Sequence, residues 1–362
     1  MTAGKLKERL IRRIEAQGPM TVAEYMTACL ADPQDGYYKT REPFGTKGDF
    51  ITAPEVSQMF GELIGAFCLT AYERLGSPSS FRLVEIGPGR GTLMADLLRA
   101  ASLRPEFLKA ADLWLVETSP RLRQIQKQTL KSSGLTPSFA DRIEDVPEGP
   151  TLLVANEFFD ALPIHQFIKA PEGWLERLVG TGPDGTLQFG AGTARLDKAG
   201  LPPHLQNAEP GTILETQPAS NAIAETIAAR LVRQGGTALL IDYGYLKSAH
   251  GDTLQALRDH RYDDVLSHPG EADLTAHVNF EALASAALKG GAKVFPPLTQ
   301  GEFLLRLGLL QRAGALGAGK PHKAQEEIRD AVERLAAPQQ MGELFKVLAI
   351  SGSSGSLVPF DD

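Results

Sequence analysis

The sequence has few cysteines, no cluster of metal-binding residues and no long apolar run, and each shortage excludes a class of protein. Only two of the 362 residues are cysteines, Cys29 and Cys68, and both lie in apolar patterns of helical spacing. We therefore expect two buried thiols and no disulfide framework. The seven histidines are scattered without an HExxH motif, which argues against a metal site. No apolar stretch reaches membrane-spanning length.

An excess of positive charge is also missing. The chain carries 37 Lys and Arg against 44 Asp and Glu, a formal net charge of -7. This balance provides no positive field for nucleic acid, whereas an acidic surface suits a cationic substrate. The basic amphipathic stretch from Lys5 to Ile14 is interrupted by Glu8, and no apolar segment follows it. It therefore predicts a surface helix and not a targeting peptide, and the expected location is the cytoplasm.

The order of the elements predicts an α/β protein. Residues 1–80 show mainly helical patterns, and from residue 81 short apolar runs alternate with amphipathic stretches. This alternation predicts a doubly wound, mostly parallel sheet after an N-terminal helical region, with insertions at about 164–210 and 298–343. The expected strands are residues 81–86, 113–117, 152–155, 237–241, 293–295 and 345–350.

Two local patterns add detail to this organisation. Thr52-Ala-Pro-Glu55 predicts a capping box at the start of a helix whose apolar face continues to Phe67. The Gly/Ser-rich stretch 351–356 predicts a flexible tail.

Three alternating glycines, Gly87, Gly89 and Gly91, follow the first expected strand directly and precede a helix. Glycines allow the backbone to turn sharply and to approach a ligand closely, at the sheet edge where ligands bind in this fold class. The dinucleotide fingerprint GxGxxG would need glycine at position 92, which is Thr92. GxGxG preceded by an acidic residue, here Glu85, resembles motif I of class I methyltransferases instead.

Glu117 ends the second expected strand, where a carboxylate can accept hydrogen bonds from both hydroxyls of a ribose. NAD-binding enzymes use the same arrangement, so Glu117 indicates a ribose ligand without distinguishing the two cofactors. The glycine loop and Glu117 together predict S-adenosylmethionine as the ligand.

Polar and aromatic residues gather after the third buried strand, in Asn156-Glu-Phe-Phe-Asp160. In this fold that position faces the transferred methyl group. Asn156 is assigned to the cofactor, Glu157 and Asp160 to a cationic acceptor, and Phe158 to a contact with a positive ligand. Nucleic-acid amino methyltransferases carry a proline where this chain has Glu157, and a carboxylate favours a guanidinium or ammonium acceptor. The alternative is that Asn156 and Glu157 cap a turn and the phenylalanines are core residues.

Several stretches taken together resemble the MidA-like family of methyltransferases. These stretches are residues 25–26, 35–38, 48–55, 58–62, 85–93, 156–163, 241–244, 273–278 and 341–345. The resemblance implies a class I methyltransferase fold, S-adenosylmethionine as cofactor and, in mitochondrial matrix relatives that assist complex I assembly, symmetric dimethylation of an arginine in a complex I subunit. It also implies that residues 45–55 form a loop near the cofactor and acceptor. Asp49 is then a catalytic candidate, and Glu55 and Tyr243 are substrate-contact candidates.

Simpler interpretations remain open for these residues: Glu55 can complete the capping box, and Tyr243 can be a core residue. For the whole chain, the first hypothesis is a methyltransferase acting on an arginine of a protein substrate. A second is a catalytically silent assembly module that retains the fold. A small-molecule methyltransferase is a further alternative, and Thr92 disfavours a nicotinamide oxidoreductase.

Overall fold

The structure, a computed structural model, describes residues 4–40, 52–197, 199 and 201–361, and the chain divides into two compact units. The first unit comprises Met1–Phe50, Phe159–Asn221 and Lys247–Ala282, and the second comprises Ile51–Phe158, Ala222–Leu246 and Leu283–Asp362. The boundary expected at residue 80 does not coincide with this division, because Ile51 and the residues after it belong to the second unit.

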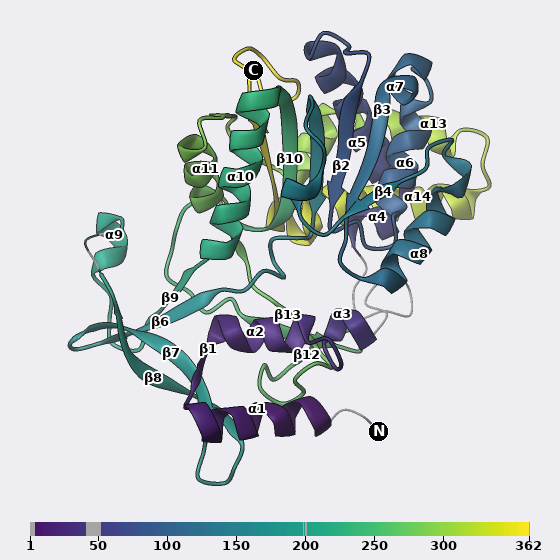
Figure 1. Ribbon diagram of the computed structural model, residues 1–362. Coiled ribbons are helices and arrows are strands. Elements are labelled where there is room, and N and C mark those ends of the chain that lie inside the picture. The colour runs from purple at the N-terminus through teal and green to yellow at the C-terminus, as the bar shows by residue number, and fades with distance from the viewer. Residues whose placement is uncertain (1–3, 41–51, 198, 200, 362) are drawn as a thin grey trace. The chain divides into compact units, whose positions relative to one another are not determined.

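The second unit contains the predicted sheet (Figure 1). Its strands follow the order β15-β17-β10-β5-β2-β3-β4, and β16 also pairs with β17. The five strands from β10 to β4 are parallel, and β17 is antiparallel to its neighbours. This arrangement confirms the doubly wound, mostly parallel fold. The bounds of these strands are β2 Phe81–Ile86, β3 Ala111–Val116, β4 Ser138–Ala140, β5 Thr151–Asn156, β10 Gly236–Tyr245, β15 Lys293–Val294, β16 Leu298–Thr299 and β17 Phe345–Ser351.

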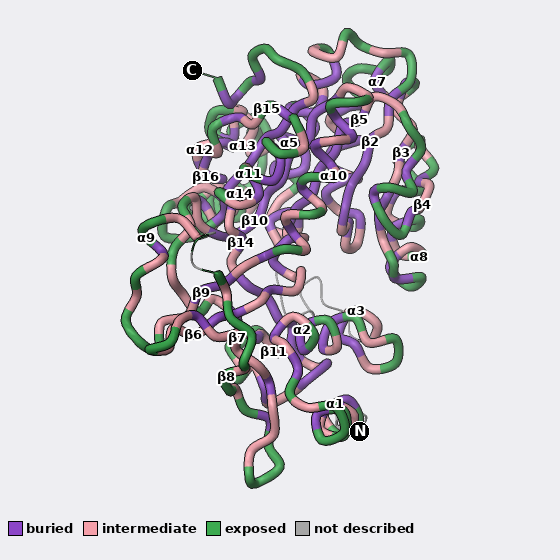
Figure 2. The backbone as a smooth tube through the Cα atoms, turned by 60° about the vertical axis from the view of Figure 1, so that its left-hand side comes forward, coloured by how far each residue is buried: buried purple, intermediate pink, exposed green. Residues whose placement is uncertain are grey.

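Helices cover both faces of this sheet, and therefore the central strands are apolar on both sides. All six residues of β5 are buried, and the buried strands stand out in the tube of Figure 2. One face packs Leu83 and Val154 against apolar residues of α5, α6 and α12 to α14 in a single core. The helices in or entering this unit are α4 Ala53–Val56, α5 Gln58–Arg74, α6 Thr92–Ala101, α7 Pro105–Ala110, α8 Pro120–Thr129, α10 Pro218–Gln234, α11 Phe280–Lys289, α12 Gln300–Arg306, α13 Leu309–Gly317 and α14 His322–Ala336.

The segment around Thr52 differs from the prediction. The side chain of Thr52 makes no capping hydrogen bond, and α4 ends at Val56. Ser57 adopts an extended conformation and caps α5, which begins at Gln58; its hydroxyl accepts a hydrogen bond from the backbone N–H of Met59. The predicted capping box is therefore wrong, because the carboxylate of Glu55 bonds to Thr92 instead.

The C-terminal stretch is also more ordered than its composition indicates. Arg74 of α5 donates hydrogen bonds to the carbonyls of Ser353 and Gly355. Beyond them, Leu357 and Phe360 are buried in the core of the second unit. The prediction of a flexible tail is wrong because a distant arginine and two apolar anchors hold this segment.

The first unit is built on antiparallel sheets. One sheet has the order β1-β7-β6-β9 with β8 on β7, and the other has the order β12-β11-β13. The predicted hairpin insertion supplies β6 to β8, whereas β1 comes from the N-terminal segment and pairs with β7. The helices are α1 Gly4–Gln17, α2 Val22–Ala31, α3 Tyr37–Thr40 and α9 Pro203–Gln206, and the strands are β1 Met20–Thr21, β6 His165–Ala170, β7 Gly173–Thr181, β8 Leu187–Leu196, β9 Ile213–Thr216, β11 Gln255–Arg258, β12 Arg261–Asp263 and β13 Asp273–Thr275.

Both cysteines are free and buried, as predicted. Burial raises the pKa of each thiol, Cys29 in the first unit and Cys68 in the second, to about 12. In the ranges that the structure describes, no helix has the length and apolar character needed to cross a membrane.

Candidate active site

The glycine loop lies between β2 and α6, at the carboxyl edge of the parallel strands. Gly87, Gly89 and Gly91 have φ values of 66°, 52° and 82°, in the left-handed region that favours glycine. A Cβ on Gly87 would lie 3.0 Å from the ring of Phe158, a tight contact that this ring would have to shift to accommodate. The loop therefore adopts the compact backbone that the alternating glycines predict.

Glu117 follows β3 beside this loop. Its carboxylate accepts hydrogen bonds from the backbone N–H of Ser119 at 2.7 Å and from Nε2 of Gln126 at 3.3 Å. The same nitrogen of Gln126 donates to the carbonyl of Gly89 at 2.8 Å. Gln126 thus connects the Glu117 carboxylate to the glycine loop, and it is not among the residues that the sequence predicts. The sequence feature that could have indicated it is its position four residues after Leu122, which puts a polar glutamine on the buried face of α8.

Glu85 occupies the interior of the sheet beneath the loop. Only 2% of the residue is exposed, and burial raises the pKa of its carboxyl group to about 8. Its Oε2 has no hydrogen-bond partner among the described residues. A buried acid without such a partner is costly, which is typical of a functional position.

The end of β5 holds a second set of polar groups. Glu157 has a φ of 50°, uncommon for a residue with a side chain. Its Oε1 accepts hydrogen bonds from Nδ2 of Asn156 at 3.1 Å and from the backbone N–H of Ala53 at 3.0 Å. These two donors orient the carboxylate, so Glu157 is a placed group and not a freely rotating surface acid.

Asp242, on β10, supports the same strand end. It is fully buried, and its carboxylate accepts hydrogen bonds from the backbone N–H groups of Phe158 at 3.1 Å and Tyr243 at 3.0 Å. The chain direction after Glu157 is therefore held by a side chain from the neighbouring strand. Tyr243, the residue that the sequence predicts as a substrate contact in this stretch, has its ring buried against Phe345 with centroids 5.4 Å apart.

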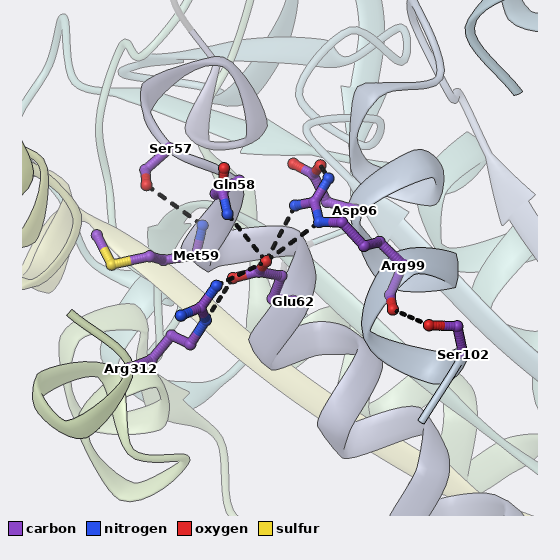
Figure 3. Close-up of polar contacts among 8 residues, drawn as sticks. All are labelled: Ser57, Gln58, Met59, Glu62, Asp96, Arg99, Ser102 and Arg312. Atoms are coloured by element: carbon purple, nitrogen blue, oxygen red, sulfur yellow. Dashed lines mark hydrogen bonds and ion pairs between the residues drawn. The ribbon is translucent and has the colours of Figure 1, made fainter. Parts of the chain in front are cut away.

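A polar cluster stabilises the helices that support the glycine loop (Figure 3). Arg99 of α6 and Arg312 of α13 both donate hydrogen bonds to Glu62 of α5, the shortest at 2.7 Å from Arg312. Burial opposes ionisation of Glu62, but the two guanidinium groups outweigh it and the pKa of Glu62 lies below its ordinary value. Figure 3 shows the two arginines reaching the carboxylate from different sides, which ties three helices together.

Three predicted site residues remain to be placed: Asp160, Asp49 and Glu55. Asp160 belongs to the first unit, where its side chain is buried and its carbonyl accepts a hydrogen bond from Ala276 at 3.0 Å. Asp49 lies outside the described residues. Glu55 lies on α4, and its carboxylate accepts a hydrogen bond from the hydroxyl of Thr92 at 2.7 Å.

Comparison with known proteins identifies this arrangement. Residues 63–298 match the model of a family of S-adenosyl-L-methionine-dependent methyltransferases, over more than half of the chain. The chain belongs to this family. Its relatives include the protein arginine methyltransferase NDUFAF7, mitochondrial, of Mus musculus, which is 38% identical over 94% of this chain and 83% of its own length. The homologue in Drosophila melanogaster is 37% identical over 96% of this chain and 85% of its own.

A solved structure, described as a COG1565 superfamily member and likely methyl transferase, is also similar to this chain. The protein from Burkholderia thailandensis bound to S-adenosyl-homocysteine has a TM-score of 0.86 at 28% identity, covering all of this chain and 96% of that chain. The fold is therefore that of a class I methyltransferase, and S-adenosylmethionine is the methyl donor.

The described residues fit that donor. Three buried oxygen atoms around the glycine loop have no hydrogen-bond partner among the described residues: Oε2 of Glu85, Oε1 of Gln126 and Oδ1 of Asn156. Acceptors of this kind match the ammonium and hydroxyl groups that the donor carries. The glycine loop leaves the backbone free of Cβ atoms at the same place.

Proposed function

We propose that this protein transfers the methyl group of S-adenosylmethionine to an arginine of a protein substrate. The curated relatives that match nearly its whole length are named protein arginine methyltransferases. The observation that carries the proposal is the oriented carboxylate of Glu157 at the end of β5, next to the strand that leads into the glycine loop.

In this proposal the donor is held by the loop and by carboxylates around it. Gly87, Gly89 and Gly91 allow close approach, Glu117 accepts the ribose hydroxyls, and Glu85 and Asn156 accept from the methionine part of the donor. When bound, the donor supplies a methyl group on a positively charged sulfur.

Glu157 has the chemistry that the acceptor needs. A guanidinium stays protonated and presents planar N–H donors, so it pairs well with a carboxylate. Without a nearby negative group, a cationic acceptor and the cationic sulfonium would repel each other. The hydrogen bonds from Ala53 and Asn156 fix the Glu157 carboxylate before the acceptor arrives, which reduces the cost of ordering it. Asp160 and Asp49 are proposed as further acidic residues for the acceptor, and Phe158 and Tyr243 as apolar contacts.

Transfer to protein arginine is tested with labelled donor. The protein is incubated with S-adenosylmethionine carrying a labelled methyl group and with lysate from a strain that lacks the gene, and labelled bands are hydrolysed for amino-acid analysis. We expect label in methylated arginine, together with a steep loss of transfer in Glu157→Gln while S-adenosyl-homocysteine affinity changes little. The matched control is Glu73→Gln, which removes an exposed carboxylate of α5 whose ion pair with Arg104 is 3.7 Å long.

Other outcomes would redirect the proposal. Loss of donor affinity together with transfer would place Glu157 in the donor site, and full activity would show that it only caps the turn. Label in a lysine or a small molecule would refute the arginine acceptor. If the protein binds donor but labels nothing, the silent assembly module is the better description.

We further propose a respiratory complex I subunit as the protein partner, on the family resemblance. Purified complex I subunits, offered singly with labelled donor, test this assignment, and a labelled band outside complex I would refute it. The predicted cytoplasmic location is tested separately by cell fractionation.

A further inference from the structure

The N-terminus of α6 has no anionic group of its own. An α-helix presents unpaired N–H groups and a partial positive charge at its N-terminus. Here the capping residue is Gly91, which has no side chain to accept a hydrogen bond, and the first turn contains no acidic residue. In related α/β folds this helix end receives the phosphate groups of a nucleotide.

A carboxylate from another part of the chain lies at this helix end. Glu55 comes from α4, 37 residues earlier, and its Oε1 lies 2.7 Å from the hydroxyl of Thr92, the first residue of α6. Because α4 has only four residues, its position depends on tertiary contacts. One of them is the hydrogen bond from Ala53 to Glu157, so α4 is held at the end of β5 as well as at α6.

We propose that Glu55 determines cofactor specificity: its carboxylate, held by Thr92 at the N-terminus of α6, excludes nucleotides that carry phosphate groups and leaves the site to an adenosyl ligand without them. The helix end is stabilised by an anion, as in phosphate-binding proteins, but here the protein supplies that anion. A phosphate brought to the same place would meet a like charge. The donor carries one carboxylate together with a cationic sulfonium, so it brings far less negative charge than a diphosphate does.

Neighbouring charges support this role. The carboxylate of Glu117 is joined to the glycine loop through Gln126, and α6 contains the buried Asp96. Burial raises the pKa of Asp96, and the nearby carboxylates of Glu62 and Glu55 add to that effect against the opposing Arg99. Asp96 is paired with Arg99 at 2.7 Å, whereas Glu55 is the carboxylate bonded to the first residue of this helix.

The experiment separates charge from steric exclusion. Displacement of labelled S-adenosyl-homocysteine is measured with ADP and with adenosine, so the ratio of the two affinities isolates the effect of the phosphates. Glu55→Gln keeps an oxygen able to accept a hydrogen bond from Thr92. In this variant we expect the affinity for ADP to rise about tenfold or more relative to the affinity for adenosine, because one like charge at close range is removed. S-adenosyl-homocysteine affinity should stay within about threefold, a change smaller than the loss of one hydrogen bond. The control Glu73→Gln removes the same charge remotely and should leave the ratio unchanged.

The assignment is wrong if the affinity ratio is unaffected in Glu55→Gln or if Glu73→Gln changes it equally. It is also wrong if a folded Glu55→Gln loses S-adenosyl-homocysteine binding. Thr92→Gly restores the dinucleotide fingerprint; if it alone admits ADP while Glu55→Gln does not, the exclusion is steric and the proposal is wrong. A further measurement uses the wild-type protein. Raising the salt concentration from about 0.05 M to about 0.5 M should increase the affinity for ADP relative to that for adenosine, because salt screens the repulsion. A decrease in this ratio would refute electrostatic exclusion.

Discussion

Glu85 makes the stability of the protein depend on pH in a predictable direction. Its carboxyl group is buried, and its pKa in the folded chain is about 8 against an ordinary value of 4.5. Below pH 4.5 the group is protonated in both the folded and the unfolded chain, so ionisation costs nothing. As the pH rises toward 8, only the unfolded chain releases the proton, and the free energy of unfolding falls.

The size of this effect follows from the pKa difference. Each pKa unit is about 1.4 kcal/mol, so the rise from 4.5 to about 8 sets an upper limit of about 5 kcal/mol. Glu85→Gln has no such ionisation, and its stability relative to wild type should increase by several kcal/mol between pH 4.5 and pH 8.5. The assay is urea unfolding at a series of pH values, followed by tryptophan fluorescence, to which Trp114 on β3 beside β2 and Trp174 on β7 contribute.

The comparison with wild type removes the contributions of all other titrating groups. Glu73→Gln, an exposed acid on α5, should show no pH-dependent difference. If the difference between Glu85→Gln and wild type is the same at every pH, Glu85 is ionised in the folded protein and the argument from burial is wrong.

The other predictions concern the donor site and the thiols. Gly89→Val should abolish S-adenosyl-homocysteine binding in calorimetry without unfolding the protein, because valine disfavours a φ of 52°; unfolding would make Gly89 a packing residue. Glu117→Gln should weaken that binding by about 1–3 kcal/mol, and unchanged affinity would exclude a ribose contact. Gln126→Leu should weaken it too, since Glu117 loses a donor; a normal affinity would show that Gln126 only packs. Neither Cys29 nor Cys68 should react with a thiol reagent before unfolding, because burial raises each pKa to about 12.

Much of the second unit could be predicted from local patterns. The strand Phe81–Ile86 and the helix Thr92–Ala101 have the bounds that the sequence indicates, because an apolar run, a glycine turn and an amphipathic helix each carry a strong short-range signal. The division into units was not predictable in the same way. The insertion after residue 164 forms a sheet with Met20–Thr21, and such pairing between distant segments leaves no periodic trace in either of them.

The proposed donor site shows the same difference. Glu85, the glycines and Glu117 could be proposed from the sequence because consecutive strand ends and turns bring them to one edge of the sheet. Gln126 and Asp242 were missed, since each acts by bonding a backbone group or carboxylate on another element, and nothing beside them in the chain marks that partner.

The sequence alone therefore determined the class of fold, the glycine loop and the acidic residues beside it, because local periodicity, turn chemistry and strand order specify them. Only the tertiary structure decided what the carboxylate of Glu55 contacts. Its local pattern indicated a capping box with Thr52, but the fold brings the hydroxyl of Thr92 to 2.7 Å from it. A side chain with two available partners takes the one that the packing of distant elements supplies, and the spacing of nearby residues does not reveal that choice.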